Sequence, residues 1–337
     1  LGVTANGTIT DSGNLTVTGV TTLAAGAAND ITLNNSNNFS TVAVTSGKDV
    51  TLNDTNGIIL GASTVSGALD VTANGNITQS GVLSVTGGAS TFTVDTGLTK
   101  DILLGTQAND FGGQPVTFTT SGGGSIRDIS FRNVNATAIA PTMPVSLRNL
   151  TLTFNAAAVD LAARTLTGTL NVTAGGAITD SGALSVTGTT TLVAGAGNDI
   201  TLNNNNNFST VTTTSGKDVT LNDTNGIILG ASTVSGNLSV TAASSTITDS
   251  GVITVGSGAT FSAVGAGGAV TLNNGLNTVK KLSIDTVGSF AVTGDSATAL
   301  TDLTIKVDPA GGARTYALTS FAGVTLALTD SGAGLNL

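Results

Sequence analysis

The sequence repeats itself, and this repetition restricts the chain to architectures built from stacked copies of one unit. Residues 1–68 and 170–237 align without a gap and are identical at 56 of 68 positions. Inside these units a shorter phrase, V-T-A followed by I-T-D-S-G or I-T-Q-S-G, begins at Val3, Val71, Val172 and Val240. Because one such unit is too thin to enclose a core, its apolar side chains must be buried against neighbouring units.

Each 68-residue unit contains triplets in which two apolar residues flank a small or polar one. Examples are residues 15–17 (LTV), 31–33 (ITL) and 50–52 (VTL). In a β-strand the two apolar residues point inward and the middle residue points outward. Parallel strands spaced about 4.8 Å apart then place each apolar side chain over its counterpart in the next coil. The pattern predicts an all-β fold, a right-handed parallel β-helix (β-solenoid) built from internal repeats.

The triplets also set an expected coil length. Successive triplets in the first unit begin 14, 16, 19 and 19 residues apart. We therefore expect about 17 residues per coil, roughly twenty coils and a rod about 90 Å long, with coils of about 23 residues as the alternative. We expect a single continuous β-solenoid over residues 1–337, with sub-repeats 1–68, 69–169, 170–237 and 238–337.

The composition agrees with an all-β fold. Only 9% of the residues are charged, all 20 acidic residues are Asp, and the chain has 61 Thr, 45 Gly and 30 Asn. Thr favours strands, whereas Gly and Asn favour tight turns. Glu and Lys, which stabilise helices, are absent or scarce, which excludes helical bundles. A hydrophobic content of 39% and a mean hydropathy of +0.33 argue against disorder.

Several classes of function lack the residues they need. The chain has no Cys and no His, so a thiolate nucleophile and an ordinary zinc site are excluded. A net charge of −9 disfavours nucleic acid as a partner. No apolar run is long enough for a transmembrane helix, and no signal peptide is visible. The chain opens at Leu1, and we expect it to be a segment of a longer polypeptide.

Three longer phrases resemble the repeats of filamentous-haemagglutinin-type exoproteins. They are LNVTAGGAITDSGALSVTGTTTLVAGAGNDITLNN at residues 170–204, KDVTLNDTNGIILGASTVSG at residues 48–67, and AND-FGG at residues 108–113. The resemblance implies a right-handed parallel β-helix within a large secreted or surface-anchored adhesin. It also implies export by two-partner secretion or by an autotransporter route.

The phrase Asp-Ser-Gly recurs at Asp11, Asp180, Asp249 and Asp330. A catalytic interpretation makes these carboxylates general acids or bases, as in glycosidases. The structural interpretation makes each phrase a corner, where Asp accepts a backbone N–H and Gly supplies a positive φ. One active site does not need four copies, so recurrence favours the corner. We expect no enzyme activity, no catalytic residue and no cofactor.

Two segments resemble parts of calcium loops. Residues 195–199 (GAGND) resemble the glycine- and Asp-rich nonapeptide of β-rolls, but Thr201 stands where that motif needs a large apolar residue. Residues 54–57 (DTNG) lack the bidentate Glu of an EF-hand. We therefore expect no metal site. The Asn runs at 34–38 and 203–207 are interpreted as turns, with stacked Asn ladders as the alternative.

Residues 100–169 differ in composition from the rest of the chain. They hold Arg127, Arg132, Arg148 and Arg164, together with three of the four Pro residues. A functional interpretation makes the four Arg residues a binding patch for an acidic glycan or another strand of an assembly. The structural interpretation, which we favour, is a few longer coils with Pro-containing corners.

The sequence therefore predicts a structural stalk or filament segment of a secreted bacterial surface adhesin. The alternative function is a module that binds glycans or a host surface on one face of the coils. The expected partners are neighbouring repeats of the same polypeptide, identical copies in a fibre, or surface glycans, and the expected location is the bacterial cell surface.

Overall fold

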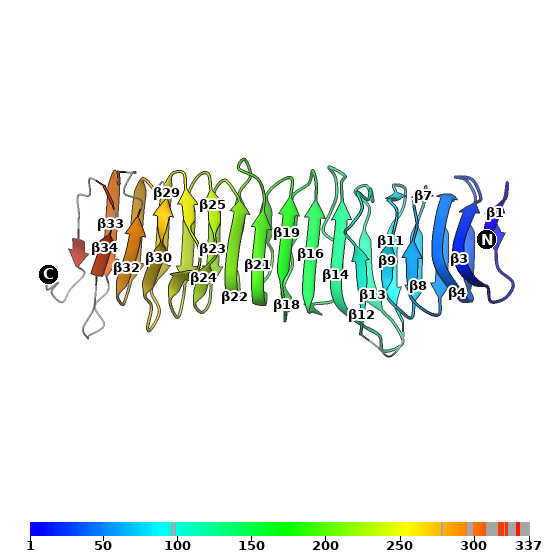
Figure 1. Ribbon diagram of the computed structural model, residues 1–337, viewed down its shortest axis with the longest axis horizontal. Helices are drawn as coiled ribbons and strands as arrows, with labels where there is room; N and C mark the ends of the chain where they lie inside the picture. Colours follow the sequence, from blue (N-terminus) through cyan, green and yellow to red (C-terminus); the bar gives the residue numbers. More distant parts are fainter. Residues whose placement is uncertain are drawn as a thin grey trace. The chain divides into compact units, whose positions relative to one another are not determined.

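The computed structural model describes residues 1–95, 97, 99–277, 279–294, 299–307, 316–319, 321–322 and 328–330. The described residues form strands, turns and bends, with no helix among them. It follows that this part of the chain offers no helix able to cross a membrane. The strands pair in parallel and stack as a β-solenoid of about 14 coils, which confirms the predicted fold class (Figure 1).

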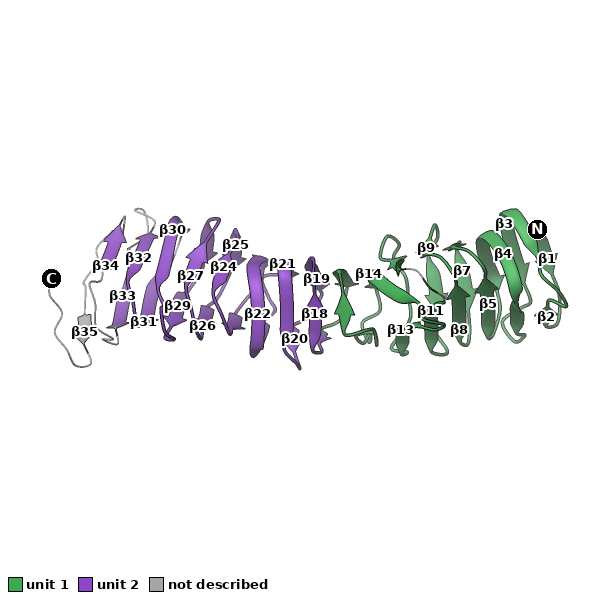
Figure 2. Ribbon diagram, turned by 90° about the horizontal axis from the view of Figure 1, so that it is seen from below, with its two compact units in different colours: residues 1–159 green, residues 160–337 purple. Residues whose placement is uncertain are grey.

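The chain divides into two compact units, residues 1–159 and residues 160–337 (Figure 2). Within each unit the strands form three parallel ladders, one along each side of the coils. Ladder I holds the triplets that follow the I-T-L or V-T-L pattern, and ladders II and III hold the strands that come next in each coil. The long strands bend and contribute to more than one ladder.

The ladders of unit 1 follow from the strand register. Ladder I contains β2 (Ile9–Thr10), the start of β4 (Ile31–Ser46), β5 (Val50–Asp54), β8 (Leu69–Ala73), β11 (Ser90–Val94) and β13 (Val116–Thr120). Ladder II contains the start of β3 (Thr16–Ala24), the middle of β4, β6 (Ile58–Leu60), β9 (Ile77–Gln79), β12 (Thr99–Leu104), β14 (Ser125–Asn133) and β16 (Asn149–Phe154), which follows β15 (Ser146–Leu147). Ladder III contains β1 (Gly2–Thr4), the ends of β3 and β4, β7 (Ser63–Val65) and β10 (Leu83–Val85).

Unit 2 has the same three ladders. Strand β17 (Val159–Leu161) lies at the boundary of the units. Ladder I contains β20 (Ile178–Asp180), the start of β22 (Ile200–Ser215), β23 (Val219–Asp223), β26 (Leu238–Ala242), β29 (Gly258–Ala263), β31 (Lys281–Thr286), β33 (Asp302–Val307) and β35 (Leu328–Asp330). Ladder II contains β18 (Arg164–Leu166), the start of β21 (Leu184–Val193), the middle of β22, β24 (Ile227–Leu229), β27 (Ile247–Asp249), β30 (Val270–Asn277), β32 (Phe290–Gly294) and β34 (Tyr316–Thr319). Ladder III contains β19 (Leu170–Ala174), the ends of β21 and β22, β25 (Ser232–Val234) and β28 (Ile253–Val255).

The coils are longer than the expected 17 residues. Ile31 pairs with Val50, which is a coil of 19 residues, whereas Ser90 pairs with Val116, which is a coil of 26. The shorter estimate was wrong because it counted some neighbouring triplets of one coil as successive coils. The triplets at 1–3 and 15–17, for example, lie in ladders III and II. The longest coils fall in residues 90–130, within and next to the segment that differs in composition.

Alternation of side chains builds the core as predicted. In β5, Val50 and Leu52 are buried while Thr51 lies between them at the surface. The wider coils of unit 1 are filled by phenylalanine rings, which pack in sequence with centroids 5.7 Å (Phe92–Phe118) and 5.6 Å (Phe118–Phe131) apart. Large rings fill the extra width that a longer coil encloses, which keeps the interior close-packed.

Copies of one sequence phrase lie on different sides of the coils. The phrase that begins at Val71 runs through ladders I, II and III in that order, as strands β8, β9 and β10. The phrase at Val3 instead begins in ladder III, as strand β1, and continues into ladders I and II. Each short apolar–polar–apolar strand fits any side, because all three sides require the same alternation.

Candidate functional site

Polar side chains meet at the corner between ladders I and II. We call this cluster the polar corner stack; it contains Asp11, Asn37 and Asp54 in unit 1. Asn37 Nδ2 donates to Asp11 Oδ2 at 2.7 Å, and Asn37 Oδ1 accepts the Leu15 N–H at 2.8 Å. Both Asp54 oxygens accept a backbone N–H at 2.7 Å, one from Phe39 and one from Asn56. The stack therefore satisfies backbone donors of three successive coils.

The same stack recurs in unit 2 with Asp180, Asn206 and Asp223. Asn206 Nδ2 donates to Asp180 Oδ2 at 2.8 Å, and Asp223 accepts the Phe208 and Asn225 N–H groups at 2.6 and 2.7 Å. Asn37, Asp54 and their counterparts Asn206 and Asp223 have no exposed surface. Two nearly identical sequences thus produce one hydrogen-bond pattern, as expected where buried polar groups must be paired.

Burial and hydrogen bonds shift the carboxyl groups of the stack in opposite directions. Burial raises the pKa of Asp54 and of Asp223 above the ordinary value of 3.8, although their backbone hydrogen bonds oppose the shift. At Asp11 burial also favours the neutral form. There, however, hydrogen bonds from Asn37, Asn35 and Asn34 together lower the pKa. The buried and the partly exposed carboxylates therefore respond differently to acid.

The geometry of the stack favours a structural task over acid–base chemistry. A general acid or base must reach a substrate proton. The oxygens of Asp54 instead accept backbone N–H groups inside the core. The sequence interpretation missed this role, although alternation places Asp54 on the inward face after Val50 and Leu52.

A second buried polar contact lies farther along unit 1. Asn109 and Gln79 exchange hydrogen bonds of 2.9 and 3.0 Å between their side-chain amides. Asn109 also accepts the Leu83 N–H and donates to the Leu104 carbonyl, each at 2.9 Å. Asn109 belongs to the AND-FGG phrase, so this phrase too joins neighbouring coils.

The Asp-Ser-Gly phrases are corners, but only half of the expected mechanism is correct. The Asp carboxylates accept backbone N–H groups from the next coil, as at Asp180, which accepts the Asn203 and Asn204 N–H groups at 3.0 and 3.2 Å. Asp249 binds Asn273 and Asn274 in the same way. Asp330 ends β35, and the Ser-Gly that follows it lies outside the described residues.

The expected positive φ at the glycine of these phrases was wrong. Gly182 and Gly251 are absent from the described glycines with positive φ. A Cβ at Gly182 would instead lie 2.6 Å from the Ala163 nitrogen, and one at Gly251 would lie 2.6 Å from the Ala231 nitrogen. These corners need Gly because the preceding coil approaches the backbone closely.

The Asn runs are not separate turns. Residues 34–38 lie inside β4, and residues 203–207 lie inside β22. Asn side chains link successive coils, as where Asn56 Nδ2 donates to Asn38 Oδ1 at 2.9 Å. The contacts resemble the ladder alternative because stacked coils bring equivalent amides together.

The two segments that resemble calcium loops hold ion pairs. Asp199 lies 3.6 Å from Lys217 Nζ, and Asp30 lies 3.7 Å from Lys48 Nζ. Gly195 and Gly26 have φ values of 81° and 85°, as their turns require. Within the described residues no group of three or more acidic side chains is placed to hold a metal ion.

Among the four predicted Arg residues, Arg127 and Arg148 come together around one carboxylate. Arg127 donates to both Asp101 oxygens at 2.9 and 2.6 Å, and its Nε lies 3.8 Å from Asp128. Arg148 forms a two-point contact with Asp128. Hydrogen bonds to these carboxylates raise the pKa of both guanidinium groups, so their positive charge is already paired.

Arg132 and Arg164 lie in other surroundings. Arg132 Nε donates to Asn155 Oδ1 at 2.9 Å. Arg164 is buried in unit 2, and burial lowers its pKa. The use of these residues as a binding patch stays a prediction.

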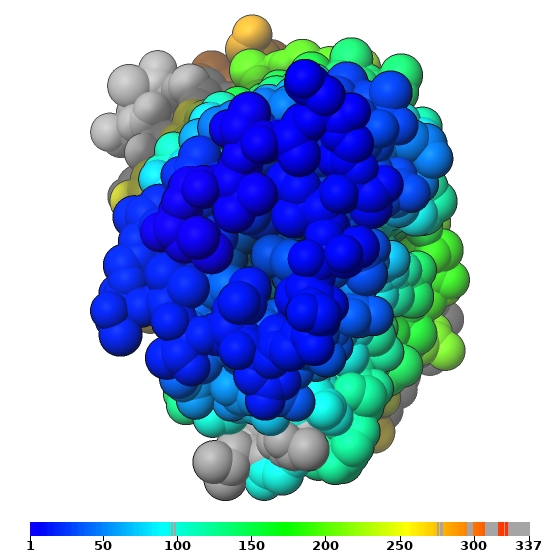
Figure 3. Space-filling view, turned by 90° about the vertical axis from the view of Figure 1, so that its right-hand side faces the viewer, coloured from blue at the N-terminus to red at the C-terminus, as the bar shows by residue number. Residues whose placement is uncertain are grey.

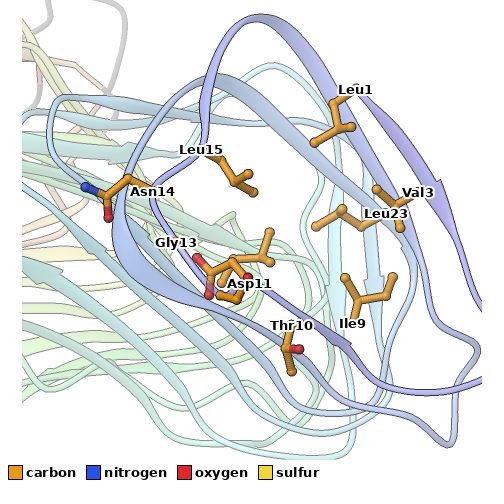
Figure 4. Close-up of a pocket in the computed structure, with 11 residues that line it drawn as sticks. Leu1, Val3, Ile9, Thr10, Asp11, Gly13, Asn14, Leu15 and Leu23 are labelled. Carbon is orange, nitrogen blue, oxygen red and sulfur yellow. The ribbon is translucent and has the colours of Figure 1, made fainter.

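An apolar hollow of about 430 Å³ lies at the first coil of unit 1. It is lined by Leu1, Val3, Ile9, Leu15 and Leu23, whose side chains point into it, together with the Asp11 corner (Figure 4). Viewed end-on, the first coil surrounds this depression (Figure 3). An open apolar interior of this kind can receive an apolar partner, as binding sites are concave and mostly apolar.

Comparison with known proteins agrees with the repeat architecture. The profile of a family described as repeats of unknown function (DUF5649) matches residues 1–46, 47–119, 147–215 and 216–286, which is more than half of the chain. No curated protein and no solved structure matches the chain. The β-solenoid chain therefore belongs to the DUF5649 family of repeats.

Proposed function

We propose that the chain is a structural stalk or filament segment of a secreted bacterial surface protein of the filamentous-haemagglutinin type. The observation that carries the proposal is the continuous backbone pairing between coils. Ladder I of unit 1 joins five successive coil-to-coil pairs from β2 to β13 without a missing strand. Such ladders share a load among many hydrogen bonds and make each coil support the next.

The polar corner stack adds to this mechanical role. Its Asn and Asp side chains bind backbone groups of neighbouring coils where the chain turns between two ladders. A corner is the place where a coil could otherwise open, since its N–H groups leave the regular ladder. The stack holds these corners closed in both units.

The packing of aromatic side chains favours a stalk over a sugar-binding surface. Eight of the ten Phe residues are fully buried: Phe39, Phe92, Phe111, Phe118, Phe131, Phe154, Phe208 and Phe261. Rings that fill the core are unavailable for stacking on a sugar. The proposed partners are accordingly neighbouring repeats or identical copies, and the proposed location is the cell surface.

Mechanical unfolding tests the proposal. The chain is tethered through both termini and stretched in a single-molecule instrument. We expect stepwise unfolding, with a force that falls in a variant carrying Asp54→Ala and Asp223→Ala. The control is Asp70→Ala, because Asp70 is exposed on the outer face of β8. Extension at negligible force, or equal forces in all three proteins, would contradict a load-bearing stalk. Antibody labelling of intact source cells tests the proposed location.

A second candidate function is binding to a glycan or a host surface. The observation that favours it is a row of outward side chains on ladder I, where Thr32, Thr51, Asp70, Thr91 and Thr117 lie in register. Hydroxyl groups at regular spacing can bind a regular polar surface. A glycan array separates the two functions, because a stalk is expected to give no signal above background, whereas a binding module is expected to retain a defined set of glycans.

A further inference from the structure

The second repeat shows what covers the first coil of a repeat. Residues 1–23 and 170–192 are equivalent in the aligned repeats. In unit 2, β18 pairs with the start of β21, so that Arg164 lies beside Leu184 and Leu166 beside Val186. The Ser181 N–H donates to the Leu161 carbonyl at 3.0 Å, and Thr179 Oγ1 donates to Asp160 Oδ1 at 2.8 Å. Residues 160–166 thus form a covering coil.

Covering changes the burial of equivalent side chains. Leu1 is 50% exposed, whereas its equivalent Leu170 is 1% exposed. Leu15 is half-buried, whereas its equivalent Leu184 is 2% exposed. Val3 and Val17 are likewise half-buried, and their equivalents Val172 and Val186 are buried. The hollow of unit 1 is therefore the surface that residues 160–166 occupy in the second repeat.

The glycines of the two coils support the same conclusion. A Cβ at Gly182 or Gly188 would collide with the covering coil, lying 2.6 Å from the Ala163 nitrogen or 2.5 Å from the Gly168 carbonyl oxygen. The equivalent Gly13 and Gly19 have no atom within 4 Å of such a Cβ. The first coil therefore has Gly at both positions where a close covering chain requires it, although no atom approaches them there.

We propose that the hollow at the first coil of unit 1 is a docking site for a polypeptide segment that adds one more coil in parallel. The chemistry of the partner is that of residues 159–166, VDLAARTL: two apolar–polar–apolar strands separated by two alanines. Its second and third apolar positions correspond to Leu161 and Leu166, which are 3% and 1% exposed where they cover the second repeat. Strand addition of this kind combines backbone hydrogen bonds with side-chain burial. The proposal holds whether or not the chain bears load.

The test uses the full chain and a labelled peptide of residues 157–168 added in trans. Fluorescence anisotropy measures binding, and hydrogen exchange locates it. We expect saturable binding and slower exchange of amides in residues 2–17. A control peptide with Leu161→Asp and Leu166→Asp is expected to bind at least about tenfold more weakly, because two apolar side chains are lost from the contact.

Two variants of the chain test the geometry. Gly13→Ala with Gly19→Ala removes the space for the covering backbone, and its own fold should be unaffected because both positions are open. We expect peptide affinity to fall at least about tenfold with an unchanged unfolding transition. The matched control is Gly197→Ala, an open position whose equivalent in the first repeat is Ala28, and it should bind normally.

Three results would overturn the proposal. The first is equal binding of the two peptides, and the second is exchange protection elsewhere in the chain. The third is self-association of the chain that is lost in Gly13→Ala with Gly19→Ala and that the peptide does not compete away. That last result would assign the hollow to a second copy instead.

Discussion

Residues 1–68 and 170–237 have nearly the same sequence but not the same surroundings. The polar corner stack has the same hydrogen bonds in both repeats, with equivalent distances that agree within 0.1 Å at Asn37 and Asn206. The first coil differs, since Leu1 is half exposed and Leu170 is buried. The comparison teaches that the contacts within a repeat are encoded locally, whereas the burial of its first coil depends on what stacks against it.

The largest expected effect comes from removing an apolar side chain beneath the covering coil. Leu184→Ala should reduce the free energy of local opening by about 2–5 kcal/mol, as buried leucine truncations do. Leu15→Ala should cost clearly less, because Leu15 is only half-buried. Denaturant-dependent hydrogen exchange measures both, since repeat arrays need not unfold in one step. Equal losses at the two sites would show that covering contributes nothing.

The glycines of the two Asp-Ser-Gly corners should respond with opposite signs. Gly182→Ala places a Cβ 2.6 Å from the Ala163 nitrogen and should destabilise the corner by about 1–3 kcal/mol. Gly13→Ala meets no atom within 4 Å and should stabilise slightly, by about 0.4–1 kcal/mol, because it restricts the unfolded chain. Chemical denaturation followed by exchange in each corner checks the signs. Destabilisation by Gly13→Ala would contradict the open geometry.

The buried carboxylates should give equal, smaller and pH-dependent effects in both repeats. Burial raises the folded-state pKa of Asp54 and Asp223 above 3.8, so their contribution to stability is complete below that value and is lost as the pH rises through the raised pKa. Asp54→Asn and Asp223→Asn should therefore become less destabilising, relative to the wild type, from acid to neutral pH. Unfolding measured as a function of pH tests this.

Asp11 supplies the opposite control for that pH series. Its folded-state pKa is lowered, so its contribution is present above the ordinary value of 3.8 and is lost as the pH falls through the lowered pKa. Asp11→Asn should therefore be most destabilising at neutral pH and least destabilising in acid. Parallel pH profiles for the Asp11 and Asp54 variants would show that burial does not distinguish the two groups.

The smallest effect is expected at the exposed ion pairs. Lys48 bridges Asp30 and Asp49, and Lys217 bridges Asp199 and Asp218 in the same way. Lys48→Met and Lys217→Met should leave the unfolding transition nearly unchanged, because exposed pairs are screened by water and salt. Melting curves at low salt and at about 1 M salt check this. A large loss at low salt in one repeat alone would reveal an electrostatic difference between the repeats.

Much of the fold could be predicted because the pattern is local. Triplets such as Val50-Thr51-Leu52 have the alternation of a strand with one buried face, and their repetition requires stacking. Coil length could not be predicted from the triplets, because all three sides of a coil use the same alternation. The roles of Asp54 and Asn37 were missed since a buried polar residue is recognisable only when its partners in neighbouring coils are known.

Local sequence was sufficient to specify an all-β chain of parallel stacked coils, since alternation and repetition act over a few residues. Tertiary structure alone decided which side of a coil each phrase occupies and which leucines are buried. It also decided why Gly182 must lack a side chain. These properties depend on contacts between residues about twenty positions apart, and identical phrases such as those at Val3 and Val71 acquire different contacts when their neighbours differ.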